Sequence, residues 1–466
     1  MESASTRSAL TSAKSVAVIG GGWAGLAAAI GATQQGHCVT LFEASRQWGG
    51  RARTLKTLLE NAPVLDNGQH ILIGGYQQTL QLMQTVGVNL EKALWRLPLN
   101  LSYPDASGLL LSAQPFPLNL ILGIAKAKGW RVSDKWSLLK TAWHWQRMQF
   151  ECAQDLSVAD LCKKLSPLIW QDLIEPLCVS ALNTPAKEAS GAVFLRVLKD
   201  ALFGVTGSSD LLLPRLDLGE IFPHAAVQWL SQQGAVCRSG VRIEKLEYLL
   251  EESKWQIADA QFDRVVLATP AWDAAHLIGP LNSEWAQTAR QMRHEAIATV
   301  YIQAPAHFQL PQPMLALRAD ANAPAQFVFD RGQIEADAKT PGLLAFVASA
   351  LKDDKAQLEV KVLKQAQELL RSLKPSHAEG ASLKIVQTVI EKRATFACTP
   401  NLKRPSSRPL EPEDGFSSAQ TPQIQYKADP KSLTVCGDYV AGPYPATLEG
   451  AVISGLHSVS SFGAKG

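Results

Sequence analysis

The sequence lacks several features by which large classes of proteins are recognised. No apolar run approaches the roughly 20 residues that a helix needs to cross a bilayer, and the first 14 residues lack the apolar segment of a secretory signal. The seven cysteines form no C-x-x-C pair and no spacing with histidine typical of zinc. A net charge of +3 is too small to indicate nucleic acid. We therefore expect no metal, no nucleic acid partner and a reducing cytoplasmic location, either soluble or peripheral on the inner face of the cytoplasmic membrane.

What the sequence does contain is a nucleotide-binding pattern close to its N-terminus. Val16–Ile19 form a short apolar run typical of a buried parallel strand, and Gly20, Gly22 and Gly25 follow with Gly-x-Gly-x-x-Gly spacing. An alanine-rich helix and a second apolar strand ending in Glu43 come next. In such a unit the glycines allow a tight turn and close approach of a pyrophosphate to the helix N-terminus, and the acid binds a ribose. The order of these elements predicts a Rossmann-like dinucleotide site.

Three further segments are suited to complete this site. Gly50 and Arg51 follow the second strand, where a glycine lets the backbone approach a cofactor and an arginine offers donors to a diphosphate. The polar cluster from Asp66 to His70 runs into an apolar strand and a glycine pair, which suggests backbone held against something flat. Near the C-terminus a short strand leads to Asp438, and a helix is expected from about Thr447. A carboxylate there can bind a ribityl hydroxyl, and the helix N-terminus can stabilise negative charge on a reduced flavin.

The segment from about residue 80 to 215 has a different character, with helical periodicity and six of the twelve tryptophans between positions 95 and 170. Residues 115–127 are apolar but too short to span a bilayer, and residues 126–147 carry six basic side chains and one acidic one. Tryptophan, apolar and basic residues together are typical of a helix at a membrane interface. A helical cap buried on the main core explains the same composition. Both interpretations remain open.

Taken together, these residues resemble the flavin-containing amine oxidase and carotenoid desaturase superfamily, at both chain ends and at the strand near Asp263. A narrower resemblance, over most of the chain, is to the squalene-associated FAD enzymes of bacterial hopanoid pathways, the hydroxysqualene dehydroxylases. The segments that carry it are 66–70, 181–185, 194–200 and 443–450. The resemblance implies an α/β fold in which a discontinuous Rossmann-like FAD-binding domain joins a mixed sheet-and-helix substrate domain.

The resemblance also implies domain limits and cofactor contacts. The FAD-binding domain is expected in three parts, 1–75, 215–280 and 431–466, with a helical substrate and membrane-contact domain at 76–214 and a second substrate part at 281–430. The residues implied in FAD binding are Gly20, Gly22, Gly25, Glu43, Gly50, Arg51, Gly68, Ile243 (by its backbone, at the adenine), Asp438, Thr447 and Leu448. Some amine oxidases attach flavin to a cysteine in the C-terminal motif. Residues 444–447 contain none, so FAD is expected to be non-covalent.

The implied reaction is a reduction, in which hydroxysqualene and reduced FAD give squalene, water and oxidised FAD. Loss of an allylic hydroxyl as water requires a proton donor, a long apolar tunnel and exclusion of bulk water, while the flavin supplies the hydride. We expect Asp66 or His70 to donate the proton, directly or through a water molecule. Histidine has the better unperturbed pKa for this task near neutrality. No motif identifies the donor that reduces FAD.

Two other functions remain open. An oxidative carotenoid or polyene desaturase would use the same cofactor in the opposite direction. A non-catalytic, isoprenoid-binding escort protein would share the fold without using flavin. The intact glycine motif, together with Glu43 and Arg51, argues against the escort protein.

Overall fold

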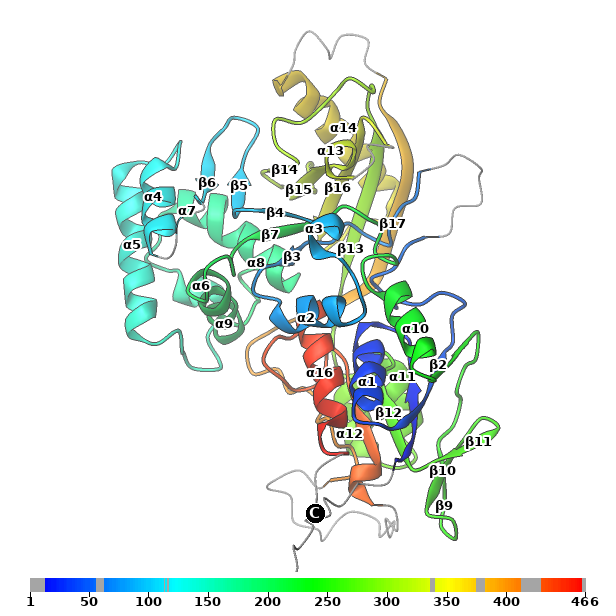
Figure 1. The fold of residues 1–466 in the computed structure, drawn as a ribbon. Coiled ribbons are helices and arrows are strands. Elements are labelled where there is room, and N and C mark those ends of the chain that lie inside the picture. Colours follow the sequence, from blue (N-terminus) through cyan, green and yellow to red (C-terminus); the bar gives the residue numbers. More distant parts are fainter. Residues whose placement is uncertain are drawn as a thin grey trace, which may run out of the picture.

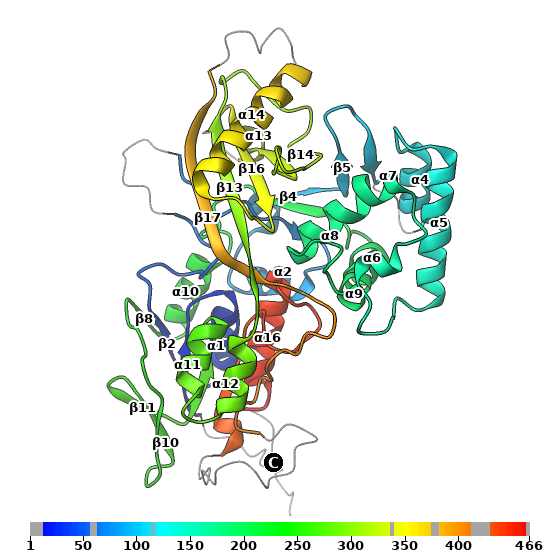
Figure 2. The ribbon, with the colours of Figure 1, turned by 180° about the vertical axis from the view of Figure 1, so that it is seen from behind.

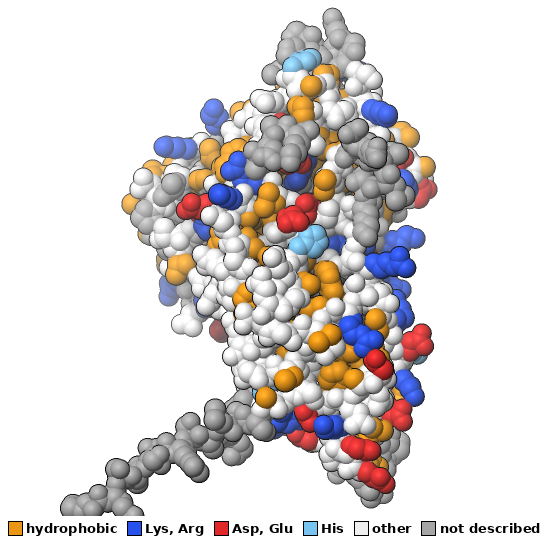
Figure 3. All heavy atoms as spheres, turned by 45° about the vertical axis from the view of Figure 1, so that its right-hand side comes forward, with side chains coloured by type: hydrophobic (Ala, Val, Ile, Leu, Met, Phe, Trp, Pro, Cys, Tyr) orange, Lys and Arg blue, Asp and Glu red, His pale blue; other side chains and the backbone are white. Residues whose placement is uncertain are grey.

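A computed structural model describes residues 13–55, 63–112, 114, 117–335, 340–373, 382–411 and 429–462. Three regions are visible in Figures 1 and 2. A lower body contains the first and last elements of the chain, an antiparallel sheet with a covering helix lies above it, and a helical lobe lies to one side, at the left of Figure 1. On the face drawn in Figure 3, the described charged side chains are of both signs and lie intermixed, in keeping with a net charge of +3.

The lower body is built on a parallel sheet of five strands with the order β18–β12–β1–β2–β8. These strands are β1 (Ser15–Ile19), β2 (Cys38–Glu43), β8 (Val236–Ser239), β12 (Arg264–Leu267) and β18 (Leu433–Val435). The central strand, β1, pairs with β2 on one side and β12 on the other. Its apolar run is buried on both faces, as expected for a parallel sheet covered by helices. The sheet thus draws strands from three distant parts of the chain.

Helices cover this sheet and join the two ends of the chain. They are α1 (Trp23–Gln34), α10 (Pro223–Gln232), α11 (Ala271–Ile278), α12 (Ser283–Arg290) and α16 (Leu448–Ser460). Helices α1 and α16 approach each other closely, because a Cβ atom on Gly455 would lie only 2.2 Å from the carbonyl oxygen of Ala24. Glycine at this position therefore brings the C-terminal helix against the helix of the glycine motif.

The beginning of α16 also holds a neighbouring element. Helix α2 (Gln77–Thr85) has no side-chain cap of its own at Tyr76. The buried carboxylate of Glu449 accepts hydrogen bonds from the backbone N–H groups of Gln78 and Thr79, at 3.0 and 2.9 Å, and one from the Thr79 hydroxyl. These bonds satisfy N–H groups that a helix start leaves unpaired. The C-terminal helix is thus tied to the segment that follows the first cofactor-binding part.

The second large sheet is antiparallel, with the order β14–β15–β16–β13–β17. Its strands are β13 (His294–Gln303), β14 (Met314–Ala316), β15 (Phe327–Asp330), β16 (Leu343–Ser349) and β17 (Lys384–Phe396). Along β16 the side chains of Leu344 and Phe346 pack toward α14 (Lys355–Leu373), whereas Ala345 and Val347 belong to the main core. This alternation, with a period of two, leaves one face of the sheet for the interior of the molecule.

Smaller elements complete the fold. The helical lobe contains α4 (Leu118–Lys126), α5 (Val132–Arg147), α6 (Val158–Leu161), α7 (Pro167–Ile169), the π-helix η1 (Trp170–Ile174), α8 (Glu175–Leu182) and α9 (Gly191–Leu202). A three-stranded sheet contains β3 (Leu72–Ile73), β4 (Leu94–Leu97) and β7 (Leu211–Pro214), and a hairpin contains β5 (Asn100–Ser102) and β6 (Gly108–Leu110). The remaining elements are β9 (Glu247–Leu249), β10 (Lys254–Ile257), β11 (Ala260–Phe262), α3 (Leu90–Ala93), α13 (Arg331–Ile334) and the short 3-10 helix η2 (Pro430–Ser432).

The architecture confirms the predicted fold class, α/β with a parallel sheet and a mixed sheet-and-helix region. The first, third and fifth predicted segments all contribute strands to the parallel sheet, while the five domain limits themselves stay predictions. Among the described helices, none combines the length and the apolar character that crossing a membrane requires.

Candidate functional site

A cavity of about 1170 Å³ lies where the three regions meet. Its walls come from the loops after β1, β2 and β12, the segment before α16, helices α8 and α9, and the inner face of the antiparallel sheet. Ligand sites in α/β folds are found at the carboxyl ends of parallel strands. A pocket for one small ligand usually measures about 300–1,000 Å³. At about 1170 Å³, this cavity lies just above that range.

The glycine motif forms one end of the cavity. Gly20 and Gly22 line it, and Gly20 has φ of +114°, a conformation that favours glycine. Glu43 also lines it at the end of β2, where its two carboxylate oxygens accept hydrogen bonds from the N–H groups of Gly21 and Ser45, both at 2.7 Å. A carboxylate oxygen can accept a second bond. Glu43 thus combines fixed orientation with remaining capacity for a ribose hydroxyl.

The start of α1 is suited to an anion. Gly22 is its N-cap residue and makes no side-chain capping bond, and the first turn contains no acidic residue. A helix start carries unpaired N–H groups and a partial positive charge. A Cβ atom on Gly22 would meet only the Gly50 Cα, at 3.8 Å, so the space in front of the helix is open. These observations fit a phosphate group in this position.

Gly25 does not line the cavity. A Cβ atom there would lie 1.8 Å from the carbonyl oxygen of Gly20 and 3.0 Å from the Ala268 side chain. The third glycine therefore allows α1 to pack closely on the strands, the structural task that the motif assigns to it, and it does not face the space for a ligand.

Arg51 and Asp438 both line the cavity and meet there, although 387 positions separate them. The Arg51 guanidinium donates to Asp438 Oδ1 at 2.6 Å and to the carbonyl oxygen of Ala394 at 2.5 Å. Burial alone would lower the pKa of Arg51, but the adjacent Asp438 carboxylate raises it. Gly50, with φ of +64°, lies beside Gly22 and lines the same wall. Arg51 and Asp438, which the sequence analysis expected to contact FAD separately, thus form one ion pair between the N-terminal and C-terminal parts of the chain.

The other predicted cofactor residues also line the cavity. Ile243 lies in a loop after β8 that is held beside the end of β2 by a bond from the Val241 N–H to the Glu43 carbonyl oxygen. Thr447 is the N-cap of α16, where its hydroxyl oxygen accepts from the Gly450 N–H at 2.9 Å, and Leu448 is the first helical residue. Gly68 lines the cavity with φ of +149°.

The rest of the cavity is mainly apolar. Its walls there come from the helical lobe, the β5 strand and the antiparallel sheet. The apolar side chains include those of Leu99, Leu101, Leu177, Phe194, Leu198, Met314, Phe327 and Phe329. This compartment is continuous with the end that carries the glycine motif. Among the described lining residues none is a cysteine.

The two predicted proton donors lie in different places. His70 lines the cavity, and its Nδ1 is 2.9 Å from the carbonyl oxygen of Gly68. Because a carbonyl oxygen only accepts, Nδ1 carries the proton and Nε2 remains for another partner. Burial lowers the pKa of His70, the bond to Gly68 opposes this, and the positive charge of Arg51 lowers it further.

Asp66, in contrast, is buried and is not one of the residues that line the cavity. Its Oδ1 accepts from the backbone N–H of Leu218 at 2.9 Å. Burial raises the pKa of Asp66 to about 7. Its carboxyl group therefore binds the backbone before α10. The role of Asp66 as a proton donor, on a segment expected to face the flavin, stays a prediction.

The structure adds polar lining residues that the sequence did not reveal. Glu391 lines the cavity and accepts a hydrogen bond from the Asn67 side chain at 3.1 Å. It precedes an irregularity in the pairing of β13 with β17, where the register shifts between Ile297 and Glu295. Such bulges re-aim side chains beside functional sites. In the sequence, Glu391 is one charged residue among several in a strand, and its partner is 324 positions away.

Asn183 is a second such residue. It ends α8 in the left-handed conformation and lines the cavity. Its Nδ2 donates to the Thr395 hydroxyl at 2.9 Å, and its Oδ1 accepts from the Ala350 N–H at 2.8 Å. The sequence motif at 181–185 marked this segment only through family resemblance. The structure shows that Asn183 joins the helical lobe to the antiparallel sheet.

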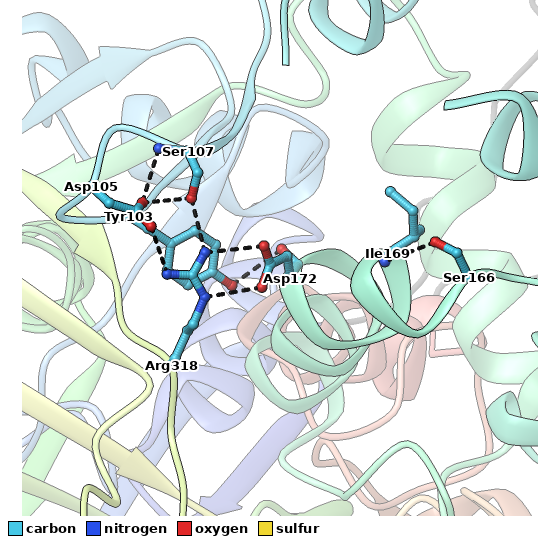
Figure 4. Close-up of polar contacts among 7 residues, drawn as sticks. All are labelled: Tyr103, Asp105, Ser107, Ser166, Ile169, Asp172 and Arg318. Atoms are coloured by element: carbon cyan, nitrogen blue, oxygen red, sulfur yellow. Dashed lines mark hydrogen bonds and ion pairs between the residues drawn. The ribbon is translucent and has the colours of Figure 1, made fainter. Parts of the chain in front are cut away.

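An ion pair between an exposed arginine and a buried aspartate joins elements near the apolar end of the molecule's interior (Figure 4). Arg318, after β14, donates to both carboxylate oxygens of Asp172 in η1, at 3.2 and 3.1 Å. It also donates to Asp105 and Ser107 in the β5–β6 turn and lies over the Tyr103 ring. The cluster connects the hairpin, the π-helix and the sheet. Within the described ranges, no group of three or more His, Cys, Asp or Glu residues is arranged to hold a metal ion.

Comparison with known sequences gives a consistent result. The sequence model of the family described as flavin containing amine oxidoreductase matches residues 23–460. A protein named hydroxysqualene dehydroxylase from Rhodopseudomonas palustris is 26% identical over 95% of this chain and 96% of its own length. A protein of the same name from Zymomonas mobilis is 24% identical over 94% of this chain and 96% of its own length.

Solved structures share the fold. Cyclohexylamine oxidase from Brevibacterium oxydans superposes with a TM-score of 0.67 at 13% identity, covering 97% of this chain and 99% of that chain. An oxidoreductase from Methanosarcina mazei superposes with a TM-score of 0.65 at 17% identity, covering 96% of this chain and all of the other. At these identities the likeness extends to the fold alone.

Proposed function

Because the chain belongs to the flavin-containing amine oxidoreductase family and is thereby a FAD-dependent oxidoreductase, we propose that it reduces hydroxysqualene to squalene. One observation carries the proposal. The cavity that contains the glycine motif continues into a compartment lined by leucine, phenylalanine and methionine side chains, which suits a long isoprenoid. The relatives that match nearly the whole chain support the choice of substrate.

The residues around the cavity supply suitable partners for each part of FAD. Gly22 and the start of α1 would hold the pyrophosphate, Glu43 a ribose, and the backbone of Ile243 the adenine. Asp438, oriented by Arg51, would hold the ribityl chain. The start of α16 at Thr447 would stabilise negative charge. The link to cysteine used by some amine oxidases would not form, because the described lining residues include no cysteine.

Bound and reduced, FAD supplies the hydride for this chemistry. The protein's own contribution is to exclude water and to deliver a proton to the leaving hydroxyl group. The apolar walls formed by Leu177, Phe194 and Phe327 exclude water from the reacting end of the substrate. An allylic cation is then not captured by solvent.

His70 is our choice for the proton donor. Its Nδ1–H is engaged by Gly68, so a proton for the substrate would leave from Nε2 of the doubly protonated ring. The lowered pKa makes that form scarce at neutral pH, but a strong acid once formed. Asp66 does not line the cavity, so it would need a connecting water or a conformational change.

We also propose that the chain works in the cytoplasm, peripherally on the inner face of the cytoplasmic membrane. The proposed substrate is an isoprenoid that partitions into lipid, and the cavity that would receive it is mostly apolar. A protein at the membrane surface would take such a substrate without its passage through water.

The direct test is anaerobic photoreduction of the purified protein followed by mixing with hydroxysqualene. We expect flavin reoxidation together with formation of one squalene per flavin. Reduction of the oxidised flavin by a polyene hydrocarbon, with formation of an additional double bond in that hydrocarbon, would instead indicate a desaturase. A purified protein without flavin absorbance, unable to take up added FAD, would favour the escort protein and overturn the proposal.

A further inference from the structure

Helix α5 has two apolar faces, and only one of them packs on the rest of the protein. Leu138, Thr141 and Trp145 are buried and point toward the core, with the spacing of one helix face. Val132, Trp136 and Trp143 repeat at the same kind of spacing on the opposite side and are 72%, 67% and 57% exposed. A helix with one core-facing stripe normally carries polar residues on its other face. The outer apolar stripe of α5 thus has no structural task in the described fold.

Helix α4 extends this stripe. Leu118, Ile121 and Leu122 are exposed at successive turns, while Gly123 and Ile124 face inward. The two helices are neighbours, because the Lys135 ammonium group donates to the carbonyl oxygen of Ala125 at 2.7 Å. Both lie at the outer edge of the helical lobe in Figures 1 and 2. The exposed apolar side chains of these two neighbouring helices, six in all, are here termed the α4–α5 face.

Basic side chains surround this face. Residues 118–147 contain six Lys and Arg residues and a single acidic residue, Asp134, which is buried. The basic residues are Lys126, Lys128, Arg131, Lys135, Lys140 and Arg147. The Arg147 guanidinium lies over the Trp143 ring, 4.8 Å from its centre, so a cation and an indole are presented together. Exposed tryptophan bordered by cations matches the interfacial zone of a bilayer with anionic headgroups.

We propose that the α4–α5 face docks the protein on an anionic lipid bilayer. This inference deepens the proposed function by naming the surface and the lipid chemistry through which the membrane is met. In the region whose interpretation its composition left open, Trp130 and Trp145 pack in the core, whereas Trp136 and Trp143 face outward.

The face is also close in structure to the cavity. Helix α4 packs tightly on β6, since a Cβ atom on Gly123 would lie 2.7 Å from the Leu111 side chain. In the same hairpin Leu101 of β5, paired with Leu109, lines the cavity. The hairpin therefore separates the docking face from the apolar compartment by one layer, which suits transfer of a lipid-soluble substrate.

The test is sedimentation of the FAD-loaded protein with phosphatidylcholine vesicles, with and without phosphatidylglycerol, in the absence of substrate. We expect binding that requires phosphatidylglycerol and weakens with salt. The double variant Trp136→Ser/Trp143→Ser and the double variant Lys128→Glu/Lys140→Glu should each lower the partition coefficient by roughly tenfold or more. Two double variants outside the face are the matched controls. Leu250→Ser/Val360→Ser replaces exposed apolar residues, and Lys364→Glu/Lys431→Glu reverses two exposed positive charges. Both should bind the vesicles as the parent does.

A second measurement needs no variant. Brominated lipids in the vesicles should quench the tryptophan fluorescence of the parent protein. Failure of the parent to bind vesicles, or equal binding by the face variants and the parent, would overturn the proposal. Light scattering gives another such outcome. If the parent is a dimer and Trp136→Ser/Trp143→Ser is a monomer, the face binds a second copy of the chain and the proposal is overturned. None of these results depends on turnover, so they are separate from the outcome with hydroxysqualene.

Discussion

At the scale of single residues, burial changes the acid chemistry of Asp66. Its pKa rises from the usual 3.8 to about 7, chiefly because the ionised carboxylate is removed from water. The folded protein therefore holds a proton that the unfolded chain releases. The resulting stability is fully present below about pH 4, decreases as pH rises, and levels off above about pH 7.

Asp66→Asn should remove this pH dependence while keeping an oxygen that accepts from Leu218. Relative to the parent, the free energy of unfolding of the variant should rise between about pH 4 and pH 7, by about 4 kcal/mol once the difference levels off. Denaturant unfolding across this range measures it. Asp263→Asn is the control, because the pKa of Asp263 is lowered in the folded protein whereas that of Asp66 is raised. Burial alone would raise the pKa of Asp263, but hydrogen bonds from Ser15 lower it, so the parent loses that contribution only at acidic pH. A constant difference between Asp66→Asn and the parent would contradict the assignment.

For His70 we expect a pH dependence of the catalytic rate, whereas Asp66 affects the pH dependence of stability. Because its pKa is lowered by burial and by Arg51, the protonated donor form becomes more abundant as pH falls below neutrality. If this form donates the proton, kcat/KM should increase toward acidic pH, and His70→Gln should remove that slope and reduce the rate by roughly 10²–10⁴. Single-turnover reoxidation of photoreduced protein across a pH series provides the profile. A variant with the parental slope and rate would exclude His70.

Gly22 and Gly25 separate two tasks that one motif performs. An alanine Cβ at Gly22 meets only the Gly50 Cα at 3.8 Å, so the apoprotein should keep its Tm. The methyl group enters the space of the proposed phosphate and should weaken FAD binding at least about tenfold, a loss of roughly 1.4 kcal/mol. At Gly25 the same change places Cβ 1.8 Å from a carbonyl oxygen, which should lower the Tm of the apoprotein itself. Thermal unfolding and flavin titration of both variants distinguish the effects, and unchanged FAD affinity in Gly22→Ala would refute the phosphate assignment.

At the scale of elements, the Arg318–Asp172 pair fixes the hairpin and the π-helix against the sheet. Asp172 is almost fully buried, so removing its partner leaves an uncompensated charge. Arg318→Met should therefore reduce the free energy of unfolding by about 1–3 kcal/mol, less than for a fully buried pair because the Arg318 side chain is 39% exposed, and Arg318→Met/Asp172→Leu should recover much of the loss. Lys245→Met, which breaks an exposed pair with Glu247, should cost less than about 1 kcal/mol.

Urea unfolding of the parent and these three variants measures the changes in the free energy of unfolding. Equal losses in Arg318→Met and Lys245→Met would show that the cluster is not a structural connection. Asp172 lies in a π-helix, and such turns are frequent at functional sites. Here the turn places Asp172 where it can reach a residue 146 positions further along the chain.

At the scale of the whole molecule, the sequence predicts what is local and leaves out what depends on distant pairing. The unit from Val16 to Glu43 was predictable because strand, glycines, helix and acid follow one another within one stretch of chain. Asp438 was singled out from the short strand before it and the expected helix after it, but its bond to Arg51, which spans 387 positions, was not predictable. Glu391 has no local signal, since a strand irregularity brings it to the cavity, and Asn183 was marked only as part of the 181–185 motif, without its contacts to the antiparallel sheet. Orientation was also beyond sequence, as the divergent positions of Asp66 and His70 show.

The joining of the chain ends can itself be tested at Gly455. A valine there would force α16 away from α1, because even a Cβ atom would lie 2.2 Å from the Ala24 carbonyl oxygen and 3.0 Å from the Ala27 Cβ. The start of α16 carries Thr447 and Leu448, which line the cavity far from the substituted position. Gly455→Val should therefore weaken FAD binding by at least about tenfold and lower the Tm of the apoprotein as well, although every residue of the glycine motif is retained.

Gly455→Val thus differs from Gly22→Ala, which should lose affinity at an unchanged apoprotein Tm. Ser460→Ala, an exposed change on the same helix, is the matched control and should behave as the parent does. Since FAD binds the folded state, saturating FAD should raise the Tm of Gly455→Val in proportion to the logarithm of its concentration. If Gly455→Val binds FAD with parental affinity, the glycine end of the chain alone holds the cofactor, and the contribution assigned to the start of α16 is absent.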